Sequence, residues 1–104
     1  MKAKRINKGV ISKSKTDDFC RRWQITQLGL FGSFLRNDFS RESDIDILVS
    51  FTPDSSWSLF DLVDMQDELA EIFGRKVDLV EREALRNPFR RREILKNLEL
   101  IYET

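Results

Sequence analysis

The segment from residue 45 to residue 51, which reads IDILVSF, constrains the fold more than any other part of the chain. A near-continuous apolar run of this length with β-branched members is typical of a buried strand. Acidic residues nevertheless stand at its start, at Asp44 and Asp46. Because side chains alternate between the two faces of a strand, both carboxylates point the same way. Ile45, Ile47 and Val49 point the other way, into a core.

A pair of neighbouring carboxylates needs a partner. Like charges this close repel each other, and one of them tends to protonate unless a cation lies between them. A divalent metal meets this need, since Mg²⁺ takes a few carboxylate oxygens together with waters and substrate phosphates. The sequence therefore indicates a metal site at Asp44 and Asp46.

A third acid, Asp78, interrupts the apolar segment Val77–Val80. If this segment is a strand beside the first one, Asp78 can lie on the same face as the pair. Three convergent carboxylates can hold two metals about 3.5–4 Å apart and clamp both oxygens of an in-line phosphoryl displacement. Asp78 would also be placed to accept a proton from an attacking hydroxyl. Taken singly, each acid could instead be an ordinary solvated strand residue.

The dipeptide Gly32-Ser33 stands twelve residues before the paired acids. Glycine lets a backbone approach a ligand closely, and free N–H groups at a helix start attract anions. The Ser33 hydroxyl adds a donor, and Arg36, one turn further on, could reach a phosphate. A Gly-Ser pair alone indicates only a turn, so its spacing to the acids carries the argument.

The remaining pattern predicts one small α/β domain with the order helix, strand, short helix, strand, helix, strand, helix. We expect residues 1–13 to be a basic, flexible tail and residues 14–104 to be the domain. The predicted helices and strands are a helix beginning near residue 14, a strand at 25–31, a short helix at 33–37, a strand at 45–51, a helix at 59–73 stopped by Gly74, a strand at 76–80, and a final helix opened by Asn87-Pro88. Two apolar stripes at helical spacing predict the buried faces of the last two helices. The stripe of the helix at 59–73 is Leu59, Leu62, Val63, Leu69, Ile72 and Phe73. The stripe of the final helix is Ile94, Leu95, Leu98, Ile101 and Tyr102.

Composition excludes several functions. The chain has 18 basic and 18 acidic residues, so no overall field draws it to nucleic acid or membrane. It has no histidine, which removes Ser-His-Asp triads, histidine zinc sites and a histidine base. The single Cys20 suits a reducing compartment and a buried apolar position. No apolar run approaches the roughly 18 residues of a membrane span. We expect a cytoplasmic protein.

The spacing of Gly32-Ser33, ten residues, then Asp44-Ile45-Asp46 resembles the GSX10DXD signature of nucleotidyltransferases of the DNA polymerase beta superfamily. The segments FCRRW, FGRKVDLV and NPFRRREIL extend the likeness to the minimal nucleotidyltransferases of antitoxin type. The resemblance implies a small palm-like α/β fold, with a mixed sheet of three or slightly more strands and helices packed on it.

The resemblance also implies an activity. Such proteins transfer AMP from ATP, with two Mg²⁺ ions, to a hydroxyl of a partner HEPN ribonuclease toxin, where the acceptor is a tyrosine. Asp44 and Asp46 then correspond to metal ligands, and Asp78 corresponds to the third ligand and the base. Gly32, Ser33 and Arg36 correspond to nucleotide-binding residues.

Other functions stay open at this stage. The protein could be an antitoxin that masks its toxin without chemistry, or a nucleotidyltransferase for a small molecule. Polymerisation on nucleic acid would need a basic groove, which the neutral total disfavours. The arginine-rich last helix, with Phe89 beside Arg90–Arg92, is either a solvated face or a contact for an acidic partner or a nucleotide. The sequence does not decide between a monomer, a homo-oligomer and a hetero-oligomer.

Overall fold

The computed structural model describes residues 12–32 and 44–104. Its helices and strands follow the chain as α1 (Lys13–Arg22), β1 (Ile25–Phe31), β2 (Ile45–Phe51), α2 (Leu59–Phe73), β3 (Val77–Glu81), a three-ten turn η3 (Arg82–Ala84), α3 (Pro88–Lys96) and β4 (Glu99–Glu103). The fold is therefore α/β, as the sequence predicts.

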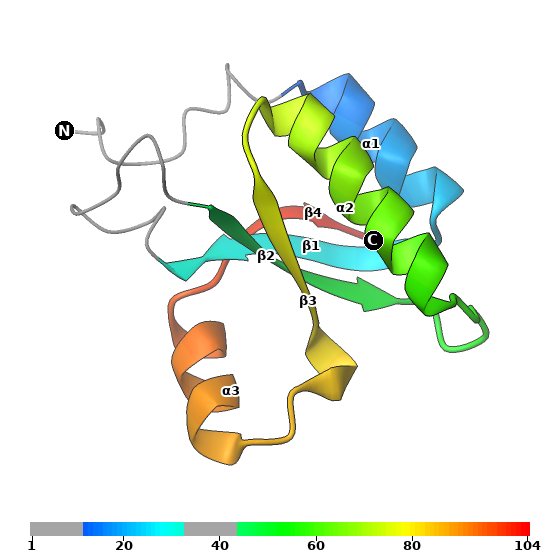
Figure 1. The fold of residues 1–104 in the computed structure, drawn as a ribbon. Helices are drawn as coiled ribbons and strands as arrows, with labels where there is room; N and C mark the ends of the chain where they lie inside the picture. Colours follow the sequence, from blue (N-terminus) through cyan, green and yellow to red (C-terminus); the bar gives the residue numbers. More distant parts are fainter. Residues whose placement is uncertain (1–11, 33–43) are drawn as a thin grey trace, which may run out of the picture.

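The strands form one mixed sheet in the order β3-β2-β1-β4. β1 is antiparallel to both β2 and β4, whereas β2 and β3 run parallel. Figure 1 shows α1 and α2 together on one face of this sheet and α3 on the other. The molecule thus has three layers, and β3 and β4 are the edges of the sheet.

Each face of the sheet has its own apolar core. The larger core lies under α1 and α2, and its fully buried members are Phe19, Cys20, Leu28, Leu30, Ile47, Val49, Met65 and Leu69. The smaller core lies under α3 and consists of Phe31, Leu48, Leu85 and Ile94. The predicted burial of Cys20 is confirmed, and burial raises the pKa of its thiol to about 12, with Asp17 adding to the effect.

Local chemistry explains the helix boundaries. The Ser58 hydroxyl accepts from the Asp61 N–H, and the Asp61 carboxylate accepts from the Ser58 N–H, which together make a capping box at the start of α2. Gly74 ends that helix in the left-handed region, at φ 71°. The Asn87 side chain caps α3, with Pro88 at its first position. The stop at Gly74 and the start at Asn87-Pro88 are confirmed as predicted from the sequence, whereas the capping box of Ser58 and Asp61 was not predicted.

Two tryptophans and a carboxylate join α1 to α2. The Trp23 indole N–H donates to Glu68 Oε1 at 3.1 Å, and the Trp57 indole N–H donates to the Trp23 carbonyl at 3.0 Å. The two indole rings meet edge to face, with centroids 5.0 Å apart. Arg22 also pairs with Glu68, and this hydrogen bond lowers the pKa of the carboxyl. Trp57 therefore caps the larger core.

The prediction that the last helix runs through Ile101 and Tyr102 is wrong. α3 ends at Lys96, and residues 99–103 form the edge strand β4 against β1. Helical periodicity fitted this segment, but its β-branched and aromatic residues also suit a strand. Pairing with β1, which lies far away in sequence, decides between the two structures. Tyr102 instead packs against the larger core from the sheet.

The predicted apolar stripe of α2 is also partly wrong. Met65 and Leu69 face the sheet with no exposed surface, whereas the side chains of Leu59 and Val63 are 74% and 48% exposed. Val63 lies two residues before Met65, and a separation of two residues turns a side chain to the other side of a helix. The stripe therefore divides between the core and the surface.

The short helix expected at 33–37 lies outside the described residues. Within residues 12–32 and 44–104, no helix has both the length and the apolar character needed to cross a membrane.

Candidate active site

The register of the two parallel strands brings a pair of predicted carboxylates to one level of the sheet. Asp46 of β2 is the register partner of Asp78 of β3. Neighbouring strands lie about 4.8 Å apart, and register partners in parallel strands point to the same face. The N–H of Ile45 donates to the Lys76 carbonyl at 2.9 Å, which fixes the beginning of both strands. The two acids therefore share one face, as the sequence analysis expected.

The carboxylates lie on the α3 face of the sheet, beyond the end of the smaller core. Leu48, two residues after Asp46, is 2% exposed in that core. Asp46 is half-buried, while Asp78 is exposed. Asp44 precedes β2 by one residue and is exposed as well. Solvent and a solvated substrate can thus reach the acids, while their strands are held by apolar packing on both faces.

Gly32 lies directly against one of these acids. It follows β1 with φ 80°, in the region where a side chain is strained. A Cβ placed on it would overlap Asp46 Oδ2 and lie 3.0 Å from Asp46 Cγ. The β1–β2 register explains this approach, because Phe31 pairs with Asp46. Glycine is needed here both for its backbone conformation and for the space that the carboxylate occupies.

Two of the predicted nucleotide-binding residues cannot be placed. Ser33 and Arg36 lie outside the described residues, so their roles stay predictions. The predicted residues that the structure does place together are Gly32, Asp46 and Asp78.

One positioning contact was missed by the sequence analysis. Gln66 of α2 accepts a hydrogen bond through Oε1 from the Leu79 N–H at 3.1 Å. Leu79 follows Asp78 on the edge strand, so this bond ties α2 to the strand that carries the third acid. The sequence offers one signal, a glutamine one residue after the buried Met65, but nothing in it identifies the partner.

The donor set suits magnesium. Within the described part of the chain, no three histidine, cysteine or acidic side chains form a ready-made metal cage. The neighbouring carboxylates of Asp46 and Asp78 nevertheless suit Mg²⁺, because this ion takes one or two carboxylates and completes its shell with waters and phosphate oxygens. The residues present therefore fit this ion, with Asp44 as a further carboxylate at the start of β2.

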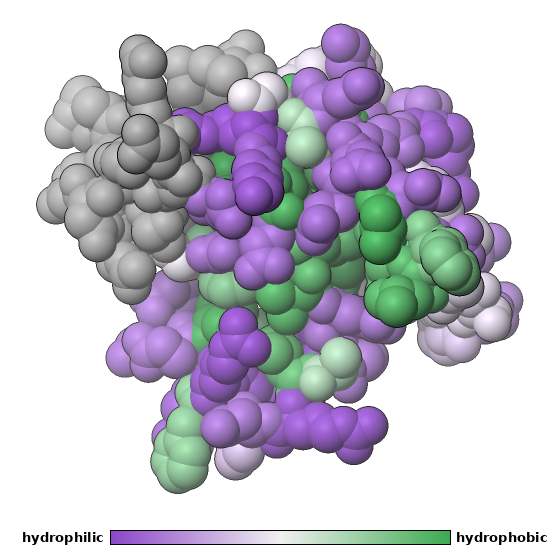
Figure 2. All heavy atoms as spheres, viewed as in Figure 1, coloured by the Kyte–Doolittle hydropathy of each residue, from purple (hydrophilic) through white to green (hydrophobic). Residues whose placement is uncertain are grey.

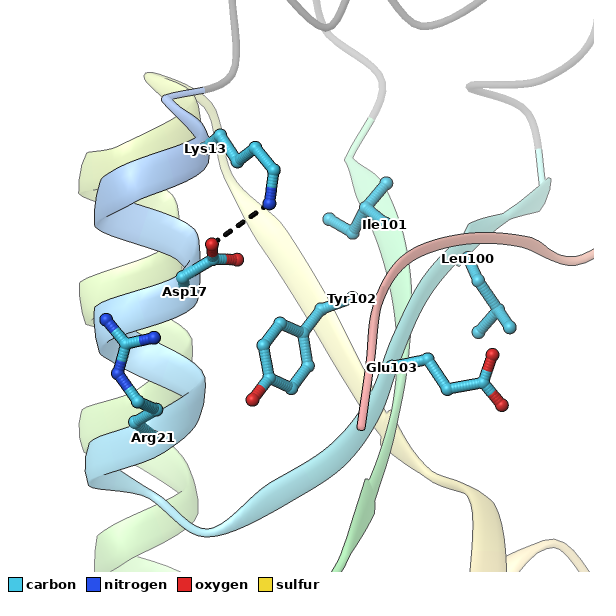
Figure 3. Close-up of a pocket in the computed structure, with 7 residues that line it drawn as sticks. All are labelled: Lys13, Asp17, Arg21, Leu100, Ile101, Tyr102 and Glu103. Carbon is cyan, nitrogen blue, oxygen red and sulfur yellow. Dashed lines mark hydrogen bonds and ion pairs between the residues drawn. The ribbon is translucent and has the colours of Figure 1, made fainter.

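A separate hollow lies between α1 and β4 (Figure 3). Its volume is about 360 Å³, and it is lined by Lys13, Asp17, Arg21, Leu100, Ile101, Tyr102 and Glu103. Lys13 Nζ and Asp17 Oδ2 pair across its upper part at 3.0 Å. None of the predicted site residues lines it. Local sequence patterns do not predict this hollow, because residues 99–103, which form its β4 wall, also fit a helix.

Comparison with known proteins gives the same family as the signature. The model of the nucleotidyltransferase domain family matches residues 13–101. A protein of Methanocaldococcus jannaschii, named provisionally as a protein adenylyltransferase, is 37% identical over 79 residues, which cover 74% of this chain and 76% of the relative. "Protein adenylyltransferase MntA" of Thermococcus cleftensis is 33% identical over 66 residues, covering 64% of this chain and 65% of the relative.

Solved structures share the fold. A structure described as a minimal nucleotidyltransferase has a TM-score of 0.68 at 26% identity, covering 84% of this chain and 86% of that one. A toxin-antitoxin structure with AMP-PNP has a TM-score of 0.70 at 21% identity, covering 89% and 74% of the two chains. The likeness extends to a chain from a complex of tri-AMPylated Shewanella oneidensis HEPN toxin with MNT antitoxin, at a TM-score of 0.63 and 20% identity, covering 88% and 70%. Signature, strand register and family model agree, and the chain belongs to the nucleotidyltransferase domain family.

Proposed function

We propose that this protein transfers AMP from Mg·ATP to a tyrosine hydroxyl of a partner HEPN-domain toxin and thereby acts as its antitoxin. The observation that carries the proposal is the register pairing of Asp46 with Asp78, with Gly32 against the Asp46 carboxylate. The names of the relatives and the complexes among the structural neighbours support the choice of AMP and of a toxin as acceptor.

The three carboxylates have distinct roles in this proposal. Asp44, Asp46 and Asp78 would hold magnesium, which would supply neutralisation of phosphate charge. Asp78 is exposed, whereas its register partner Asp46 is half-buried, and Asp78 accepts the proton of the incoming hydroxyl. Gly32, Ser33 and Arg36 bind the triphosphate, with the missing Cβ of Gly32 leaving space beside Asp46.

The proposed reaction forms one bond, breaks one bond and transfers one proton. The tyrosine oxygen forms a bond to the α-phosphorus, and the bond from that phosphorus to the oxygen bridging to the β-phosphate breaks. Pyrophosphate leaves with the electron pair of the broken bond, and the hydroxyl proton passes to Asp78. The product is an AMP ester on the toxin.

The decisive test is transfer of label from ATP labelled at its α-phosphate to the purified toxin. The wild type should label the toxin in the presence of Mg²⁺, and mass spectrometry should place AMP on a tyrosine. An Asp44→Asn/Asp46→Asn variant should lose the label. Asp54→Asn is the matched control, because it removes an exposed carboxylate from the loop before α2.

Two outcomes would overturn the proposal. Neutralisation of the toxin by the double variant as efficiently as by the wild type would indicate masking by binding alone. Label on a small molecule and none on the toxin would indicate a small-molecule nucleotidyltransferase.

A further inference from the structure

The start of α2 presents an unusual apolar surface. Three neighbouring side chains, Leu59, Phe60 and Val63, are 74%, 83% and 48% exposed. Two of them, Leu59 and Val63, also line a hollow of about 170 Å³ between α2 and the edge strand, whose other lining residues are Leu62, Gln66, Leu79 and Glu81. On the face shown in Figure 2, apolar side chains gather over the beginning of α2. A cluster of this kind on one helix turn marks a contact surface.

The same helix is strongly acidic. Residues 59–73 contain five acids and no lysine or arginine. Phe60, Asp64, Asp67 and Glu71 follow one another at helical spacing and are all exposed, so they form one outward stripe. We call these four residues the acidic stripe, which begins with an aromatic side chain and continues with acids. The three acids of the stripe make no hydrogen bond or ion pair with other described residues.

α3 carries the opposite pattern. Residues 86–96 contain four arginines and Lys96 against a single acid, Glu93. Phe89, Arg92 and Lys96 form an outward stripe at helical spacing, and the Phe89 side chain is 81% exposed. This basic stripe is apolar in its first turn and positive afterwards. Its cations form no ion pair within the described part of the chain.

The spacings of the two stripes match. Seven residues separate Phe60 from Asp67, and seven separate Phe89 from Lys96, which is about 10.5 Å along a helix in both cases. Laid side by side in the same direction, the helices place Phe89 on the apolar surface of α2 while Lys96 faces Asp67. Arg92 then lies near Asp64. Within one molecule this contact cannot form, because α2 and α3 lie on opposite faces of the sheet.

We propose that a second copy of this chain occupies the α2 surface, with the basic stripe of its α3 against the acidic stripe of α2. Every copy offers both surfaces in equal number, which accounts for opposite charge clusters on a chain whose total is zero. An aromatic anchor against exposed apolar side chains, with arginines around it, is the usual composition of an interface hot spot. A nucleic acid, in contrast, would use α3 only and would leave the apolar surface of α2 exposed.

The test is the oligomeric state of the full chain, measured by sedimentation velocity over a range of concentrations. Wild type should self-associate, and added salt should weaken the association because exposed charge pairs are screened. Asp67→Lys and Lys96→Glu should each raise the dissociation constant about tenfold, since each turns an attraction into a repulsion. The double variant, which exchanges the charges, should return to within about threefold of the wild type. Lys15→Glu on α1 is the control for Lys96→Glu, with the same change of charge, and should not alter association.

A mixing experiment tests the apolar anchors. Phe60→Ser damages only the α2 surface, and Phe89→Ser damages only the α3 surface. Each variant alone should be monomeric, whereas a mixture should form a complex through the one intact pair of surfaces. Circular dichroism confirms that each variant is folded. A wild type that stays monomeric at about 100 μM would overturn the proposal, as would a charge-exchanged double variant that does not regain association.

Discussion

The two faces of β2 show how one strand serves both folding and chemistry. Toward α1 and α2, Ile45, Ile47 and Val49 are 3%, 0% and 0% exposed. Toward α3, burial changes along the strand, since Leu48 is 2% exposed whereas Asp46, two residues earlier, is half-buried. One face is covered along its whole length, and the other is covered only where η3 and α3 reach.

This difference teaches where chemistry can be placed in a small domain. A covered position allows only apolar or fully hydrogen-bonded side chains. Ser50, at the far end of the α3 face, is buried and satisfies this rule by donating to Glu83 at 2.7 Å. Asp46 lies where the cover ends, so solvent reaches its carboxylate while the opposite face of the same strand holds it in place.

The largest expected effect is a difference between substitutions at two adjacent residues of β2 whose side chains lie on opposite faces of the sheet. Ile47→Ala should destabilise the protein by about 2–5 kcal/mol, because it leaves a cavity in the larger core. Asp46→Asn should change stability by less than about 1 kcal/mol but lower AMP transfer roughly 100-fold or more. Urea unfolding and single-turnover transfer measure the two effects. Equal losses of stability in both variants would remove the distinction between the faces.

The second prediction compares two glycines that share a positive φ. Gly32→Ala should cost about 1 kcal/mol for its backbone and more for displacing the Asp46 carboxylate, so both stability and transfer should fall. Gly74→Ala is the matched control, because it has φ 71° but no atom within 4 Å of the added Cβ. It should cost about 1 kcal/mol with no effect on transfer by the folded protein. If both alanine variants retain full transfer, the contact of Gly32 with Asp46 has no role in the reaction.

The third prediction concerns the contact between α1 and α2, which lies outside the site. The hydrogen bond from Arg22 lowers the pKa of Glu68, with a further contribution from the Trp23 indole. A carboxyl whose pKa falls on folding stabilises the protein above its ordinary value near 4.5, and this contribution is lost as the pH drops through the lowered value.

Glu68→Gln should therefore destabilise the protein at pH 7 and match the wild type at low pH. Both partners are partly exposed, so the difference should stay below about 1 kcal/mol. Urea unfolding of both proteins between pH 7 and pH 3 measures it. A difference that is constant with pH would show that the charge of Glu68 contributes nothing.

Local patterns in the sequence were sufficient for much of the fold. The strands 25–31 and 45–51 were predicted with the bounds observed, because each is an apolar run between clear turn or charge signals. The stop at Gly74 and the start at Asn87 follow from local capping chemistry. β4 was missed because its residues fit two periodicities, and only pairing with β1 selects one of them.

The residue types of the candidate site could be predicted from the sequence, but the contacts between them could not. Alternation along the strand predicts Asp44 and Asp46 on one face with no tertiary information. The pairing of Asp46 with Asp78 depends on strand order, and the approach of Gly32 to Asp46 depends on the register of β1 with β2. Both are contacts between segments distant in sequence, which local patterns do not determine.

The smallest expected effect is at Cys20, in the fully covered core on the side of the sheet opposite the acids. Burial, together with Asp17, raises the pKa of the thiol to about 12, so almost none of it is thiolate at pH 8. A thiol reagent at pH 8 should react with the native protein only as fast as the protein opens, and at the full rate of a free cysteine in urea. Transfer activity should be unchanged after prolonged exposure of the native protein. Rapid labelling of native protein would show that the core under α1 opens readily. That result would contradict the description of this face of β2 as fully covered.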